Sequence, residues 1–97
     1  MMLTEHISNI VKPLILSGIY KDEEVALKEI ILDHVLRKNQ KYKRVILEFQ
    51  AKYKLNFEEF SEKITNKATV EEEDDWMDWK AAIEMNDAWN KVANMIL

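Results

Sequence analysis

The sequence predicts an all-α protein: a single domain of four to five helices, with a helical bundle completed by dimerisation. Apolar residues recur at three- and four-residue spacing along most of the chain, which is the period of a helix face. One Gly and one Pro in 97 residues leave too little turn chemistry for β-hairpins. The apolar stripes are wider than a surface helix requires, so part of them is expected to bury against a second copy or a partner.

The first expected helix carries an apolar stripe that ends near residue 17. Because a proline inside a helix removes a backbone donor and clashes with the preceding turn, Pro13 predicts either a kink or a helix that begins late. Gly18 stands where a left-handed residue would end the helix. The stripe follows i, i+3, i+4, i+7 and i+8 spacing and consists of Ile7, Ile10, Val11, Leu14 and Ile15.

A second helix is expected over residues 22–38 and a third over residues 40–54. Asp22 can accept from the free amides of the first turn of the second helix, while Glu23 and Glu24 face the positive end of its dipole. The stripe of the second helix consists of Ala26, Leu27, Ile30, Ile31, Val35 and Leu36, with Leu32 at its margin. The third helix places Tyr42, Val45, Ile46, Phe49 and Tyr53 on one face.

Two capping boxes predict the starts of the last two helices. Asn56 with Glu59 opens a short helix, and Thr69 with Glu72 opens a helix that can reach the C-terminus. The apolar side of the short helix consists of Phe57, Phe60 and Ile64. The seam of the last helix consists of Trp76, Trp79, Ile83, Val92, Ala93 and Ile96, and is interrupted by Asn86 and Asn90.

The chain shows no internal repeat and no low-complexity linker, so residues 1–97 are expected to form one helical domain. Within it, residues 1–68 would form a helical core and residues 69–97 an acidic, Trp-rich C-terminal helix. No apolar run approaches the roughly 18 to 20 residues of a membrane span, and the start lacks a secretory pattern. Together with the absence of Cys, this predicts a cytoplasmic protein without membrane contact.

Catalytic apparatus is not expected. A single Gly excludes a glycine-rich phosphate loop, and there is no Cys nucleophile. His6 and His34 are 28 residues apart and have no ligand-spaced neighbour. The acidic run 71–78 is better explained by the helix dipole and by solvation than by a metal site. The sequence therefore predicts a protein that is not an enzyme and that holds no metal or cofactor.

The three tryptophans of the chain lie in its last 22 residues, inside its most acidic part. Residues 71–97 carry eight acids against two lysines. Trp and Met are frequent at interface hot spots, and acids around them would steer the segment toward a basic partner protein. The alternative is that Trp76 and Trp79 only complete the core. The predicted partner-binding residues are Glu72, Asp75, Trp76, Met77, Asp78, Trp79 and Trp89.

The middle of the chain carries the opposite charge and supports a second hypothesis. Residues 37–54 contain seven basic residues and one acid. Cations interleaved with aromatics are typical of nucleic-acid surfaces, although these aromatics also lie at core spacing, which would leave an ordinary solvated face. The possible phosphate-binding residues are Arg37, Lys38, Lys41, Lys43 and Arg44. A third alternative is a purely structural helical oligomer.

Residues 10–37, reading IVKPLILSGIYKDEEVALKEIILDHVLR, resemble the two-helix region of small ribbon-helix-helix-like antitoxins from prokaryotic toxin-antitoxin pairs. The matching residues are Gly18, Ile19, Tyr20, Asp22, Glu23, Glu24 and Ala26. Residues 42–64, YKRVILEFQAKYKLNFEEFSEKI, look like the continuation found in a helical branch of these proteins. The resemblance implies a homodimeric or partner-bound regulator whose acidic C-terminal segment occupies a basic toxin, commonly one that cleaves RNA.

The N-terminus departs from that pattern. A ribbon-helix-helix protein contacts DNA bases through an N-terminal strand that pairs in the dimer. Residues 2–8 offer only Thr4, His6 and Ser8 on one face and no Arg or Lys. Direct recognition of DNA by this element is therefore not expected.

Overall fold

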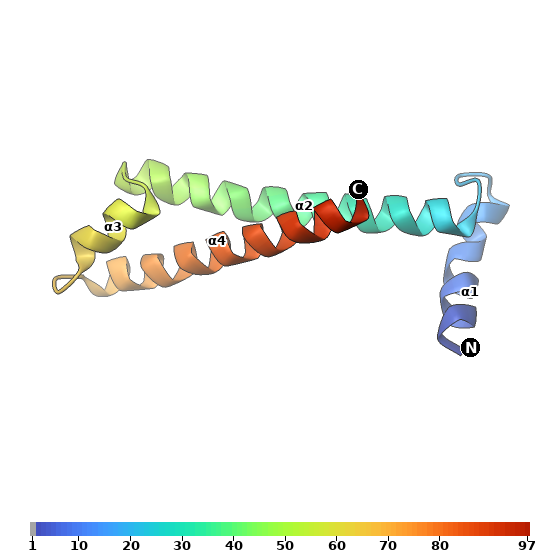
Figure 1. Cartoon of the computed structure of the whole chain (residues 1–97), viewed down its shortest axis with the longest axis horizontal. Coiled ribbons are helices and arrows are strands. Elements are labelled where there is room, and N and C mark those ends of the chain that lie inside the picture. Colours follow the sequence, from blue (N-terminus) through green and yellow to red (C-terminus); the bar gives the residue numbers. More distant parts are fainter. Residues whose placement is uncertain (1) are drawn as a thin grey trace. The chain divides into compact units, whose positions relative to one another are not determined.

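The computed structural model describes residues 2–97, with side chains from residue 5 onward (Figure 1). These residues form four α-helices and no strand, which confirms the all-α class and the lower of the two expected helix counts. None of the helices in the described chain has the combined length and apolarity needed to cross a membrane. The helices are α1 (Met2–Leu16), α2 (Glu23–Tyr53), α3 (Phe57–Ile64) and α4 (Val70–Ile96).

The chain divides into two compact units. Unit 1 runs up to His34 and includes Ile96, while unit 2 runs from Val35 to Met95 and includes Leu97. Unit 1 therefore holds α1 and the first part of α2, and unit 2 holds the rest of α2 with α3 and nearly all of α4. All the residues predicted to bind a partner or nucleic acid lie in unit 2.

In unit 1, local sequence signals set the helix ends. Helix α1 begins at Met2 and contains Pro13, so of the two alternatives predicted from Pro13 the late start is wrong, and residues 2–16 are helical rather than extended. Gly18 has φ +80° and follows the end of α1 as expected. Asp22 Oδ1 accepts from the Val25 amide at 2.9 Å, which confirms the predicted cap of α2.

Unit 1 buries few apolar side chains. Only Val11 and Ala26 are buried among its side chains from residue 5 onward. A segment of this size rarely folds alone without a disulfide, a metal or association with another chain. Its large exposed apolar residues are Ile7, Ile10, Leu16, Ile19, Val25, Ile30 and Ile31.

Helix α2 is one continuous helix of 31 residues, so the expected break between residues 38 and 40 is wrong. No Gly or Pro interrupts the segment, and nothing else in it stops a helix. Asn39 does not compete for the helix backbone, because its side chain donates to Asn90 Oδ1 and accepts from Asn86 Nδ2 on α4. The residue between the two expected helices is therefore a helix–helix contact.

Both predicted capping boxes are present in unit 2. The Glu59 amide donates to Asn56 Oδ1 at 2.8 Å and the Asn56 amide to Glu59 Oε1 at 3.2 Å. At the start of α4, the Glu72 amide donates to Thr69 Oγ1 at 3.1 Å and the Thr69 amide to Glu72 Oε1 at 3.0 Å. Local sequence thus fixes where α3 and α4 begin.

Within unit 2, α4 lies alongside the second half of α2, and α3 connects them (Figure 1). The two long helices are antiparallel, because Asn39 pairs with Asn90 near one end and Lys52 with Asp75 near the other. An aromatic cluster fills the end beside α3, with Trp79 and Phe60 fully buried. The cluster consists of Phe49, Tyr53, Phe57, Phe60, Trp76 and Trp79.

Candidate functional site

The seven residues predicted to bind a partner lie on two sides of α4. The inner side packs against α2 and α3, and the outer side is exposed. Of the seven, only Met77 and Asp78 are exposed. The other five are buried or half-buried: Glu72, Asp75, Trp76, Trp79 and Trp89.

Trp79 lies at the centre of the aromatic cluster. Its ring stacks on Phe49 at a centroid distance of 5.6 Å and meets the edge of Phe57 at 5.5 Å. The side chain is 0% exposed, and among the described residues its indole N–H finds no hydrogen-bond acceptor. In this chain, Trp79 is therefore a core residue.

Trp76 is held between α3 and α4. Its indole N–H donates to Ser61 Oγ at 2.8 Å, and its ring stacks on Phe57 at 5.7 Å. Ser61 in turn donates to the Phe57 carbonyl at 2.8 Å. The Lys80 ammonium lies 5.3 Å from the centre of the Trp76 ring, on the more exposed side of the helix. Trp76 is thus oriented by its own chain.

Asp75 forms a polar cluster with the end of α2. Its carboxylate accepts from the Tyr53 hydroxyl and lies 2.6 Å from Lys52 Nζ, which also lies 2.9 Å from Glu71. The hydrogen bonds from Lys52 and then from Tyr53 lower the pKa of Asp75 below its ordinary value. Burial, followed by the bond to Asp75, raises the pKa of Tyr53 to about 12. The Asp75 carboxylate therefore joins the start of α4 to the end of α2.

Glu72 caps the N-terminus of its own helix. Its carboxylate accepts from the Thr69 amide, and that backbone hydrogen bond is the main cause that lowers the pKa of Glu72. Farther along the inner side, Asn86 Nδ2 donates to the Asn39 carbonyl at 3.1 Å, and Asn90 Oδ1 accepts from Asn39 Nδ2. The two asparagines that interrupt the seam are therefore paired across the helices.

The outer side of α4 carries a second apolar stripe that sequence analysis missed. Val92, expected on the seam with Trp76 and Trp79, belongs to it, because Val92 is 37% exposed and lies at four- and three-residue spacing from Ala88 and Met95. Met77 is 63% exposed and Met95 is 84% exposed. This outer stripe consists of Met77, Ala81, Met85, Ala88, Val92 and Met95, all of them exposed. Their three- and four-residue spacing was the available signal.

Carboxylates border the outer stripe. The ion pairs on α4 among the described residues are Lys52 with Glu71 and Asp75, and Lys91 with Asp87 at 3.0 Å. None involves the exposed acids beside the stripe, which are Glu73, Asp74, Asp78 and Glu84. The outer side of α4 therefore combines exposed apolar groups with carboxylates that have no ion-pair partner in the described chain.

The residues predicted to bind nucleic acid are only partly brought together. Arg37, Lys41 and Arg44 share one side of α2 at i, i+4 and i+7 spacing. Lys43 lies on a different side of the helix, and Lys38 is half-buried. The basic stretch of the sequence thus yields a row of three cations rather than a broad patch.

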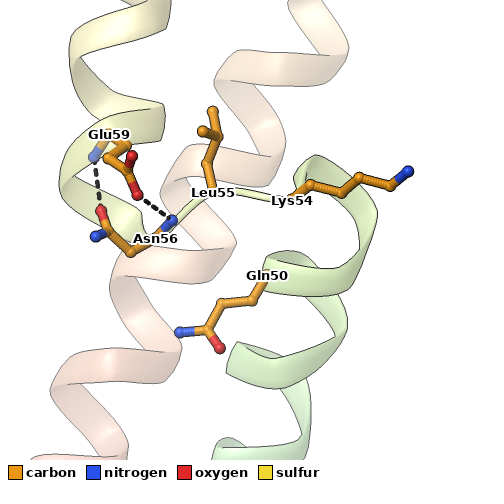
Figure 2. Close-up of a pocket in the computed structure, with 5 residues that line it drawn as sticks. All are labelled: Gln50, Lys54, Leu55, Asn56 and Glu59. Carbon is orange, nitrogen blue, oxygen red and sulfur yellow. Dashed lines mark hydrogen bonds between the residues drawn. The ribbon is translucent and has the colours of Figure 1, made fainter.

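The described residues contain no metal-binding cluster, and the recess beside α3 is lined by groups with a structural role. Within the described residues, no group of three His, Asp or Glu side chains is arranged to hold a metal ion. An open recess of about 320 Å³ lies where α2 meets α3 (Figure 2). Its polar groups include the Asn56 and Glu59 capping pair, while Lys54 points away from the other labelled side chains. These groups serve the start of α3.

Comparison with known proteins gives no match: no protein-family model, no curated protein and no solved structure matches this chain. A function therefore has to be inferred from the surfaces of the chain itself.

Proposed function

We propose that the protein is a non-enzymatic protein-binding module, an antitoxin-like inhibitor whose C-terminal helix binds a basic partner protein. The observation that carries the proposal is the outer side of α4. There, the apolar outer stripe runs between carboxylates that have no ion-pair partner in the described chain. Apolar contact area surrounded by uncompensated charge is what an interface with an oppositely charged protein requires.

The binding residues differ from those that the sequence suggested. Trp76 and Trp79 hold α4 against its own chain, so the proposal does not use them as contacts. Met77 and Asp78 remain from the predicted set. They are joined by the rest of the outer stripe and by its neighbouring acids.

The test is retention of host proteins on the tagged chain, comparing wild type with a double charge reversal, Asp78→Lys with Glu84→Lys. Both positions are exposed, so the fold should persist, which circular dichroism would verify. A matched control reverses two exposed acids elsewhere, Glu48→Lys with Glu62→Lys, and changes the net charge equally.

Wild type and control are expected to retain the same basic protein, and the α4 variant to lose it. When that protein is expressed alone it should slow growth of the host, and coexpression of the wild-type chain should relieve the effect. Equal retention by all three chains would remove the α4 surface from the proposal. Retained protein with no effect on growth would remove the inhibitor role.

A nucleic-acid-binding regulator is the second candidate, favoured by the shared side of Arg37, Lys41 and Arg44. Contacts to phosphates release counterions, so such binding should weaken steeply with added salt. Under this alternative, nucleic acid would co-purify with the tagged chain. It would be lost from a Lys41→Glu, Arg44→Glu variant that still retains the basic protein.

Self-association through unit 1 is also proposed, because that unit exposes many aliphatic side chains and buries few. Light scattering during gel filtration should give twice the 11.5 kDa of one chain. Changing Ile10 and Leu16 to Asp, at exposed positions, is expected to return the mass to that of a monomer. A wild-type monomer at about 100 μM would contradict this part of the proposal, because a dimer with a dissociation constant of about 1 μM would be largely formed at that concentration.

A further inference from the structure

We infer that the outer stripe of α4 is a docking site for a single amphipathic α-helix with basic flanks. The inference rests on the proposed function, because it specifies which part of the basic partner lies against α4. From Ala81 onward the outer stripe alternates four- and three-residue steps, through Met85, Ala88, Val92 and Met95. That alternation is the seam of helices that pack side by side.

An extended peptide fits this surface less well than a helix does. Peptides that bind as strands gain their affinity from main-chain hydrogen bonds to an open sheet edge. The described chain contains no strand, and the backbone groups inside α4 are paired within the helix. The stripe from Met77 to Met95 runs about 27 Å, at 1.5 Å per residue, which is about five turns of a partner helix.

The shape of the outer stripe surface is also complementary to a helix. Ala81 and Ala88 are one heptad apart and form low points, while Met85 and Val92 stand next to them. Side chains of an approaching helix can enter such low points. Methionine is flexible and polarisable, so it adapts its shape to the side chains that it meets.

Charge selects a basic helix over a second copy of α4. In a parallel pair of α4 helices, the four exposed carboxylates of residues 73–84 would face one another, and the one basic residue among them, Lys80, lies over the Trp76 ring. In an antiparallel pair, they would face residues 85–95, where the one basic residue, Lys91, already pairs with Asp87. A helix with Lys or Arg along both edges of its apolar side avoids this repulsion, because its cations would face the carboxylates of α4.

The test uses a synthetic probe, a labelled 21-residue helical peptide with Leu at the seam positions and Lys at the flanking positions. Two comparison peptides share its seam: one carries Glu at the flanks, and one carries two central prolines that prevent a helix. Binding is measured by fluorescence anisotropy with the full chain. Two variants are compared, Met85→Gln with Val92→Gln on the outer stripe, and Leu47→Gln at an exposed position of α2.

The basic helical peptide is expected to bind best, and its affinity to fall about tenfold or more with Met85→Gln and Val92→Gln but not with Leu47→Gln. Failure of the basic peptide to bind, equal binding of the proline peptide, or an unchanged affinity in the α4 variant would each overturn the inference. A host basic protein that is lost with Asp78→Lys and Glu84→Lys yet kept with Met85→Gln and Val92→Gln would overturn only this inference. The absence of any retained basic protein would overturn the proposed function itself.

Discussion

Replacing Trp79 with alanine is expected to lower the free energy of unfolding by about 3–5 kcal/mol, the usual cost of removing a large buried aromatic side chain. Trp79 is fully buried and contacts rings from α2 and α3, among them Phe49 and Phe60. Its removal would leave a cavity where three helices meet. Urea titration followed by far-ultraviolet circular dichroism measures the change.

Two further variants separate the cavity from other effects. Met77→Ala removes an exposed side chain two residues away and should change stability by no more than about 0.5 kcal/mol. Trp79→Phe keeps a ring in the cluster and loses no hydrogen bond, because the indole N–H has no acceptor among the described residues. It should cost clearly less than Trp79→Ala. Similar losses for Met77→Ala and Trp79→Ala would contradict the assignment of Trp79 to the core.

Replacing Asp75 with asparagine is expected to cost about 1–2 kcal/mol, because it weakens the hydrogen bonds that a half-buried carboxylate accepts. Asp75 accepts from the Tyr53 hydroxyl and from Lys52, and thereby joins the end of α2 to the start of α4. The same urea titration measures the loss. Asp74→Asn is the matched control, since Asp74 is exposed and forms no ion pair among the described residues. An equal loss from both variants would contradict this role for Asp75.

The same cluster predicts how stability depends on pH. Because the folded chain lowers the pKa of Asp75, its contribution is complete above the ordinary value of 3.8 and is lost as the pH falls below it. Because the folded chain raises the pKa of Tyr53 from 10.0 to about 12, that contribution is complete below pH 10 and is lost as the pH rises toward 12. Asp75→Asn should flatten the acid limb of the unfolding profile. An acid limb identical to that of wild type would contradict the prediction.

The sequence predicted those parts of the fold that depend on a few neighbouring residues. The capping boxes at Asn56 and Thr69, the cap at Asp22 and the left-handed Gly18 all formed as expected. Each is a hydrogen bond or a backbone conformation decided within about four residues. Contacts between distant segments are not needed to form them.

The incorrect predictions concern features that depend on contacts between segments far apart in the sequence. The expected boundary between residues 38 and 40 does not exist, and Asn39, which lies at that point, contacts α4. Helix α4 carries apolar residues on both of its sides, and a three- and four-residue repeat does not say which side faces the core. The sequence therefore left open whether Trp76 and Trp79 bind a partner or complete the core, and their neighbours in space are Ser61 and Phe57 from α3.

The hydrogen bonds among Asn39, Asn86 and Asn90 also bear on the entropy of association. Turning α4 about its own axis, or sliding it along α2, would break the bonds that Asn39 forms with Asn86 and Asn90, at a cost of roughly 1 kcal/mol or more for each lost bond. The rotational setting of α4 is thus fixed before any encounter. The backbone of the outer stripe is already ordered in the free chain, so the loss of backbone freedom on binding would fall on the incoming helix, and α4 would lose only the rotamer freedom of its exposed side chains.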